Sequence, residues 1–306
     1  MHYYTSMQDL IGHTPIVKLN HLDLPKEVSL FAKLELYNPS GSVKDRIGRA
    51  MINAAEEQGK LKPGGTIIIA TAGNTGLGVA FAALNRGYQI IVVVPEKFSV
   101  EKQTLMHALG AKIIHTPRSE GMLGANARSL ELHRSIANSI VIDQFSDLNN
   151  PKEHFRTTGP EIYEALDGNI DTIIAGAGSG GTFSGVVGYL KSKKPGIHAV
   201  LADPIGSTLG GGQHSDYNIE GIGNDFIADT FDFDLVDSVI KVNDDEAYGA
   251  SRLLASKEGI FAGSSSGAAL AAALKYIETN KSGNIVIILP DRGDRYFSKD
   301  LYTTNE

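Results

Sequence analysis

The chain has 306 residues, 42% hydrophobic and 21% charged, so it can bury a large core and form two lobes. Its net charge of −7 argues against nucleic acid or an anionic membrane as a partner, because both bind positive surfaces. It contains no cysteine, which excludes disulfides, a cysteine nucleophile and thiolate metal ligands, and we expect no metal site. No stretch reaches the ~18 apolar residues of a membrane span, so we expect a soluble cytoplasmic protein.

Short β-branched runs alternate with segments of helical spacing in two blocks. The first block has runs at 66–71, 89–95 and 112–117, and the second has runs at 171–178, 198–204 and 284–290. Near-continuous apolar strands joined by helices are typical of parallel sheets covered on both faces. We therefore expect an α/β protein with two lobes, each a mostly parallel twisted sheet covered by helices, and a boundary near the stretch FSDLNNPKEHF.

The stretch NPSGSVKDR, residues 38–46, places Lys44 at the start of a predicted amphipathic helix. A charged lysine meets the positive end of the helix macrodipole there, which is mildly unfavourable. Two interpretations follow. Either Lys44 is an ordinary surface lysine balanced by Asp45, or its amine is used in the neutral form.

The stretch TAGNTG, residues 71–76, lies between a predicted strand and a predicted helix, where ligands collect in open α/β sheets. Thr71, Asn74 and Thr75, together with the amides around Gly73, offer donors suited to a carboxylate. The alternative is plain N-capping, in which Asn74 or Thr75 satisfies an amide at the start of the helix.

The stretch GAGSGGT, residues 176–182, follows an apolar strand and precedes a helix. Its glycines let backbone amides converge on a phosphate, although the Gly-Lys-Ser/Thr ending of a Walker loop is missing. Gly176, Gly178 and Gly181 also match the dinucleotide pattern G-x-G-x-x-G, with Asp203 as a ribose-binding acid at the end of the next strand. A nicotinamide-dependent dehydrogenase therefore remains an alternative, as does a turn that serves only close packing.

Two further segments follow. Residues 209–226 have three consecutive glycines and little periodicity, which predicts a long loop. Ser264, Ser265 and Ser266 then precede a strongly helical run. Serine in this place is usually a helix cap, but three hydroxyls stand where one would suffice.

Six stretches occur in the order NPSGSVKDR, TAGNTG, NPKEHFRTTGPE, GAGSGGTFSG, EGIGNDF and GSSSGAAL. Together they resemble the cysteine synthase and cystathionine β-synthase family of pyridoxal-phosphate enzymes, and the resemblance runs from residue 9 almost to the end. It implies pyridoxal 5′-phosphate as cofactor, the tryptophan synthase β-like fold known as PLP fold type II, and a homodimer. It also implies a smaller mobile lobe of residues 1–12 and 36–147, a larger lobe of residues 13–35 and 148–306, and no haem-binding or regulatory domain.

The resemblance also assigns roles. Lys44 carries the cofactor as a Schiff base and later removes the Cα proton. Asn74 bonds the ring hydroxyl of the cofactor, and Ser265 meets its pyridine nitrogen. The phosphate is held by Gly178, Ser179, Gly180, Gly181 and Thr182. The substrate is bound by Thr71, Ala72, Gly73, Asn74, Thr75, Gln144 and Gly221.

Two positions depart from the cysteine synthase pattern, which usually has serine at the position of Ala72 and a large aliphatic residue at that of Ser264. Both resemble bacterial cystathionine synthases that use O-acetylserine and homocysteine, so we expect homocysteine to be preferred over sulfide. A sulfide-using cysteine synthase and an inactive amino-acid binder remain alternatives. Asp225 could contact the amine of an incoming thiol or activate water, or it is a solvated loop residue.

Overall fold

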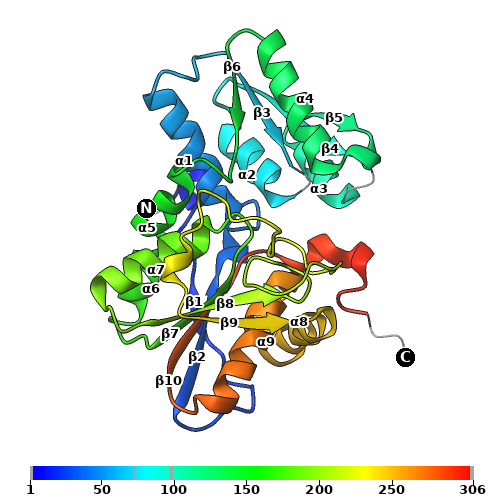
Figure 1. Cartoon of the computed structure of the whole chain (residues 1–306). Coiled ribbons are helices and arrows are strands. Elements are labelled where there is room, and N and C mark those ends of the chain that lie inside the picture. Colours follow the sequence, from blue (N-terminus) through cyan, green and yellow to red (C-terminus); the bar gives the residue numbers. More distant parts are fainter. Residues whose placement is uncertain (1–2, 72, 97–98, 304–306) are drawn as a thin grey trace. The chain divides into compact units, whose positions relative to one another are not determined.

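The computed structural model describes residues 3–71, 73–96 and 99–303, and the chain groups into two compact units (Figure 1). Unit 1 comprises residues 1–11 and 44–150, and unit 2 comprises residues 12–43 and 151–306. Residues 36–43, which we expected in the first lobe, belong to unit 2. The reason is their pairing with the segment after the last strand, where the amide of Val43 donates to the main-chain oxygen of Pro290 and Ser42 forms a bridge with Asp291.

Unit 1 is built on a four-stranded parallel sheet with the strand order β5-β4-β3-β6. Its strands are β3 (Thr66–Ala70), β4 (Gln89–Pro95), β5 (Lys112–Thr116) and β6 (Ser139–Ile142). Its helices are α1 (Lys44–Glu57), α2 (Asn74–Ala83), α3 (Val100–Ala108) and α4 (Gly121–Ser135), with short 3-10 turns η1 (Met7–Leu10) and η3 (Arg118–Glu120). Helix α5 (Asn149–Arg156) begins at the end of this unit.

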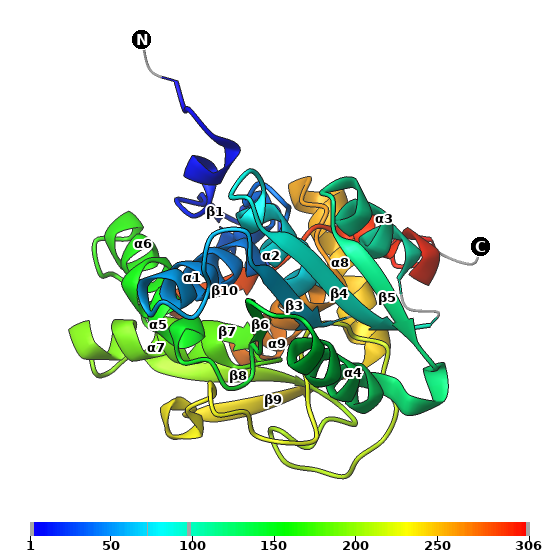
Figure 2. The same cartoon turned by 90° about the horizontal axis from the view of Figure 1, so that it is seen from above.

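Both faces of this sheet are covered, as the apolar runs predict. Ile67 and Val92 face a core made with α1, α2 and α3, whereas Ile68 and Val93 face α4 on the other side. Figures 1 and 2 show α2 and α4 on opposite sides of the sheet. A buried strand that alternates between two covered faces has no polar side, which explains its continuous apolar sequence.

Unit 2 is built on a six-stranded sheet with the strand order β1-β2-β10-β7-β8-β9, in which only β1 is antiparallel to its neighbour. Its strands are β1 (Ile16–Lys18), β2 (Val28–Leu34), β7 (Thr172–Gly176), β8 (His198–Pro204), β9 (Ser238–Val242) and β10 (Gly283–Leu289). Its further helices are α6 (Thr158–Ala165), α7 (Gly181–Lys193), α8 (Asp244–Glu258) and α9 (Ser264–Thr279). Its 3-10 helices are η2 (Glu35–Tyr37), η4 (Phe233–Leu235) and η5 (Gly293–Lys299).

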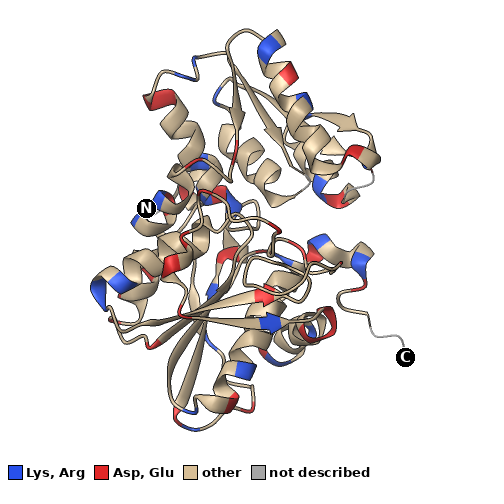
Figure 3. Cartoon of the chain, viewed as in Figure 1, with Lys and Arg blue, Asp and Glu red and all other residues tan. Residues whose placement is uncertain are grey.

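The six-stranded sheet also lies between two helical layers. Helices α8 and α9 pack on one face around residues such as Leu270, and α6 and α7 pack on the other around residues such as Phe183. The prediction of mostly parallel sheets covered by helices is therefore confirmed. Residues 205–232 form no helix or strand, as expected for the glycine-rich stretch. Basic and acidic residues are interspersed over the helices of both units (Figure 3).

Candidate active site

The glycine loop of unit 2, residues 177–180, joins the end of β7 to the start of α7. Gly180 has a φ of 82°, in the left-handed region, and a β-carbon there would collide with Phe231. A β-carbon on Gly178 would lie 2.5 Å from the main-chain oxygen of Gly221. Both positions therefore require glycine. The first amides of α7 have no acceptor within the helix, so this tight loop fits a phosphate group.

Thr182, at the end of the predicted phosphate loop, contacts a buried histidine. Its Oγ1 lies 3.1 Å from Nε2 of His154, whose Nδ1 lies 2.9 Å from Oγ1 of Thr158. A proton on Nε2 would be donated to Thr182 and would leave the threonine hydroxyl hydrogen for an anion. Sequence reasoning missed His154, and the available signal was its place in the motif NPKEHFRTTGPE, four residues before Thr158.

The three serines occupy the first turn of α9, after Gly263 as N-cap. The helix-cap interpretation is therefore wrong, because none of them stands at the N-cap position. The Oγ of Ser264 accepts a hydrogen bond of 3.0 Å from the amide of Glu220. The Oγ of Ser266 is buried and has no hydrogen-bond partner among the described residues. Ser265 is almost fully buried, and its Oγ would lie 4.0 Å from a β-carbon on Gly221.

The segment after β10 supports this helix start. The amide of Gly263 donates to the main-chain oxygen of Asp291, and the hydroxyl of Tyr296 donates to the Asp291 carboxylate. Burial, reinforced by the Asp291 charge, raises the pKa of Tyr296 well above its ordinary value. The phenol therefore stays a neutral donor at physiological pH and holds Asp291 beside the first turn of α9.

Residues 218–224 lie between the two predicted cofactor elements of unit 2. At one end, the Asp244 carboxylate accepts the amides of Asn218 and Ile219. At the other end, the amide of Gly223 donates to the main-chain oxygen of Ala177 over 2.8 Å, next to the glycine loop. The predicted substrate residue Gly221 stands between them with a φ of 88°. The structure thus brings Gly178, Gly221 and Ser265 together within unit 2.

Asp225 lies at the exposed outer part of the same loop. Its Oδ1 lies 3.0 Å from Nδ1 of His214, and the side chains are 56% and 62% exposed, respectively. Asp225 therefore contacts another loop residue while its side chain stays largely exposed to solvent.

Asp203, the predicted ribose-binding acid of the dehydrogenase alternative, is fully buried. Its Oδ2 accepts hydrogen bonds from Nζ of Lys241 at 2.5 Å and from the amide of Gly210 at 3.0 Å. A carboxylate held in this way braces the start of the 205–232 segment and presents no exposed oxygen to a ribose. The structure thus gives Asp203 a supporting role in the loop.

Lys44 is the first residue of α1 in unit 1, as predicted, and is partly buried. Asp45 is fully buried, so the interpretation of a solvated surface pair does not fit. Helices α1 and α2 approach to backbone contact here, because β-carbons on Gly48 and Gly78 would each lie 2.6 Å or less from the main chain of the other helix. This contact fixes the helix end that carries Lys44 beside the TAGNTG segment.

Several residues of the predicted carboxylate site lie around the start of α2 in unit 1. Gly73 is the N-cap of α2, so the alternative in which Asn74 or Thr75 caps this helix is wrong. The amide of Gly73 donates to Oγ1 of Thr71 over 3.1 Å. The hydroxyl of Thr75 donates to Oε1 of Gln144 over 2.8 Å. These residues, far apart in sequence, therefore meet at a helix N-terminus that favours an anion. The predicted residue Ala72 lies outside the described residues.

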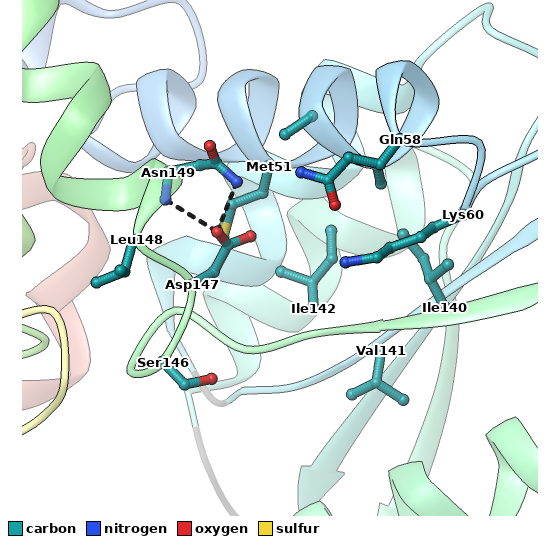
Figure 4. A pocket seen from close by; sticks show the side chains of 12 residues that line it. Met51, Gln58, Lys60, Ile140, Val141, Ile142, Ser146, Asp147, Leu148 and Asn149 are labelled. Carbon is teal, nitrogen blue, oxygen red and sulfur yellow. Dashed lines mark hydrogen bonds between the residues drawn. The ribbon is translucent and has the colours of Figure 1, made fainter.

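A separate pocket of about 350 Å³ lies within unit 1, between the second half of α1, strand β6 and residues 146–149 (Figure 4). Asp147 accepts hydrogen bonds there from the amide and the side chain of Asn149. None of the predicted site residues lines this pocket. Within the described ranges, no group of three His, Asp or Glu side chains could hold a metal ion, and no helix is long and apolar enough to span a membrane.

The chain belongs to the pyridoxal-phosphate dependent enzyme family, whose model matches residues 7–291. It is therefore an enzyme with pyridoxal phosphate as cofactor, and the glycine loop and helix start described above fit that group. This assignment rules out the two alternatives from the sequence, a nicotinamide-dependent dehydrogenase and an inactive amino-acid binder.

The chain is similar to several bacterial members of the family. It is 49% identical to the O-acetylserine dependent cystathionine beta-synthase of Bacillus subtilis, over 97% of each chain. It is 45% identical to a cysteine synthase of Helicobacter pylori, over 97% of this chain and 98% of that one. The crystal structure of O-acetylserine dependent cystathionine beta-synthase from Helicobacter pylori has a TM-score of 0.93 and 44% identity, covering 99% of this chain and all of the other.

Proposed function

We propose that the enzyme catalyses β-replacement on O-acetyl-L-serine and that homocysteine is its preferred thiol, giving cystathionine. The similarity to a relative named as an O-acetylserine dependent cystathionine beta-synthase supports this reaction. Sulfide is the alternative nucleophile, supported by the similarity to a relative named as a cysteine synthase.

The proposed roles are given to Lys44 and the α2 start in unit 1, and to the glycine loop in unit 2. When bound, the cofactor withdraws electrons from Cα of the amino acid and so eases loss of its β-substituent. The amine of Lys44 holds the cofactor and then moves the Cα proton. Asn74 bonds the ring hydroxyl, and Thr75 and Gln144 bind the substrate carboxylate with the α2 amides. In unit 2, the loop from Gly178 to Thr182 binds the phosphate.

The observation that carries the proposed reaction type is the place of Ser265 in the first turn of α9. A neutral hydroxyl beside the pyridine nitrogen favours ring protonation less than a carboxylate would. The positive end of the α9 dipole disfavours a ring proton further. Both effects limit delocalisation of the Cα electrons into the ring, which favours prompt expulsion of a β-substituent.

The leaving group argues for O-acetylserine rather than serine as first substrate. Acetate leaves without a proton, whereas expulsion of hydroxide requires an acid placed at the β-oxygen. None of the residues assigned above supplies such an acid.

The choice of nucleophile depends on Ala72 and Ser264, where small or polar residues replace the usual serine and large aliphatic side chain. Homocysteine needs room and partners for its ammonium and carboxylate, whereas sulfide needs neither. The hydroxyl of Ser264 holds the amide of Glu220, a bond that an aliphatic side chain could not form. Binding the polar groups of homocysteine can give ~10²-fold discrimination, but sulfide fits any pocket that admits homocysteine, so residual sulfide activity is expected.

The deciding measurement is kcat/KM for homocysteine and for sulfide at saturating O-acetylserine. We expect the higher value for homocysteine. A higher value for sulfide would make the protein a cysteine synthase, and absence of turnover with both thiols would contradict the proposed reaction.

We further propose that the protein is a cytoplasmic homodimer that binds neither nucleic acid nor membranes. Exposed apolar side chains at the N-terminus, including Tyr4 and Met7, support an interface with a second copy. Light scattering should give twice the chain mass of 32.7 kDa, and a monomer at micromolar concentration would contradict the assembly.

A further inference from the structure

The carbonyl oxygens of two successive residues in the glycine loop are held by side chains from the irregular 205–232 segment. Nδ2 of Asn224 donates to the oxygen of Gly178 over 2.5 Å. The hydroxyl of Thr230 donates to the oxygen of Ser179, also over 2.5 Å. Neither contact is predictable from spacing, because each joins residues more than 45 positions apart.

Asn224 is itself firmly held. Its main-chain amide donates to Oγ of Ser207 over 3.0 Å. Its main-chain oxygen accepts hydrogen bonds from the amides of Thr208 and Leu209, each over 3.1 Å. Lys241 binds the oxygen of Ser207 over 2.7 Å. The side-chain amide of Asn224 therefore acts from a fixed point and does not simply follow the glycine loop.

Thr230 is buried just as firmly. It is 2% exposed, and Ser179 is 4% exposed. Two residues further along, the amide of Asp232 donates to Oγ of Ser184 in α7 over 2.8 Å. The segment that carries Thr230 is therefore fastened to the helix that the glycine loop begins.

The consequence follows from the planarity of the peptide bond. In a trans peptide, the carbonyl oxygen of one residue and the N–H of the next point in opposite directions. Holding the oxygens of Gly178 and Ser179 toward the 205–232 segment directs the N–H groups of Ser179 and Gly180 away from it. Successive N–H groups that point to the same side can form an anion-binding nest, whereas a flipped peptide would present its oxygen to the anion.

We propose that Asn224 and Thr230 are positioning residues that hold these two peptide planes in the orientation required by the cofactor phosphate. The proposal rests on the assignment of residues 178–182 as the phosphate site. It gives part of the 205–232 segment a role in cofactor affinity, separate from the role of Gly221 and Asp225 toward the substrate.

The sharpest test compares Thr230→Val with Thr230→Ser, because valine keeps the shape and loses the donor while serine keeps the donor. Full-length enzyme stripped of cofactor is titrated with pyridoxal phosphate and with pyridoxal, which lacks the phosphate. We expect Thr230→Val to weaken pyridoxal phosphate binding about tenfold, to change pyridoxal binding less than about twofold, and Thr230→Ser to restore affinity. The ³¹P resonance of the loaded Thr230→Val enzyme should also shift from its wild-type position.

Asn224→Ala provides an independent second variant, and Asn218→Ala is its control. Asn218 belongs to the same segment, but its side chain donates to Asp244 and not to the glycine loop. We expect selective loss of pyridoxal phosphate affinity for Asn224→Ala and wild-type affinity for Asn218→Ala. If Thr230→Val does not fold, Asn224→Ala decides the question.

Two failures are distinguishable. Wild-type enzyme that binds pyridoxal as tightly as pyridoxal phosphate would contradict the phosphate site itself. Wild-type enzyme that prefers pyridoxal phosphate, with the preference unchanged in the folded Thr230 and Asn224 variants, would overturn the proposed positioning role alone.

Discussion

A β-carbon on Gly78 would lie 2.5 Å from the main-chain oxygen of Lys44. Helix α2 therefore packs directly on the backbone of the residue assigned to hold the cofactor. Gly78→Ala must push α1 and α2 apart, because the atoms that the new β-carbon would meet belong to the main chain of Lys44 and cannot move aside alone. We expect a loss of about 1–3 kcal/mol in unfolding free energy and a lower kcat, since the start of α1 moves with the shift.

The control for this substitution is Gly249→Ala in α8. A β-carbon there meets nothing within 4 Å, so alanine should raise stability by about 0.5–1 kcal/mol through helix propensity. Chemical denaturation of both variants separates crowding from the general effect of removing a glycine. Equal effects of the two substitutions would contradict a tight contact at Gly78.

Lys44→Ala should abolish β-replacement, with a fall of at least ~10³-fold in kcat, because no other described residue has been assigned to move the Cα proton. Cofactor can still bind through the glycine loop, so retained cofactor is compatible with this prediction. Lys60→Ala is the control, because Lys60 is an exposed lysine that lines the separate pocket of unit 1. Near-normal turnover by Lys44→Ala would remove the assigned role.

Ser265→Asp should retain cofactor but slow elimination of acetate from O-acetylserine. A carboxylate beside the pyridine nitrogen favours its protonated form and greater delocalisation of the Cα electrons. Stopped-flow absorbance after mixing with O-acetylserine measures this first half of the reaction. An unchanged rate would mean that Ser265 does not meet the ring nitrogen.

Ser264→Ala and Ser266→Ala form a matched pair within one helical turn. Ser264 accepts the Glu220 amide, so its loss should cost about 0.5–1.5 kcal/mol of stability and raise KM for the nucleophile. The buried Oγ of Ser266 lacks a partner among the described residues, so alanine there should be neutral or stabilising. A larger loss of stability from Ser266→Ala than from Ser264→Ala would contradict these contacts.

Asp225→Asn tests whether Asp225, which contacts His214, has a role in the choice of nucleophile. We expect kcat/KM to fall more for homocysteine than for sulfide, because only homocysteine carries an ammonium group that a carboxylate attracts. His214→Gln is the companion variant, since it removes the partner and keeps Asp225. If Asp225→Asn changes kcat/KM equally for homocysteine and for sulfide, Asp225 has no role in selecting the nucleophile and acts only within the loop.

The central strands and the strand-to-helix turns were predictable because their signals are local. The run at 66–71 is apolar between its two threonines and is followed by glycine and threonine, which suffices to place β3 and the start of α2. Strand β2 was not predicted, since it contains Lys33, whose burial depends on Glu161 at 2.6 Å and on the oxygen of Thr14 at 2.7 Å. A charged residue can enter a core only with partners, and distant partners are invisible in a local pattern.

The residues of the candidate site also differ in whether a local sequence pattern indicates them. Lys44, Thr75 and Gly178 stood out because they lie at strand-to-helix turns or helix starts, and the family resemblance then assigned their roles. Asn224 and His154 were missed because they are distinguished only by their hydrogen bonds, to the glycine loop and to Thr182, respectively. Their places in NPKEHFRTTGPE and EGIGNDF were visible in the sequence, but the contacts were not, because each partner lies in a distant segment.

The pairing of β2 with β10 affects the order in which the nascent chain can fold. Val28 pairs with Gly283, and Leu34 pairs with Leu289, so β2 must remain without this neighbour until nearly the whole chain has been made. At ~5–20 residues per second, that interval is roughly 13–50 s, during which an apolar strand is exposed to other chains. The four strands of unit 1 lie between residues 66 and 142 and are complete much earlier. A nascent chain that contains the strands of unit 1 but not yet β10 therefore carries β2 with one edge open to pairing with other chains.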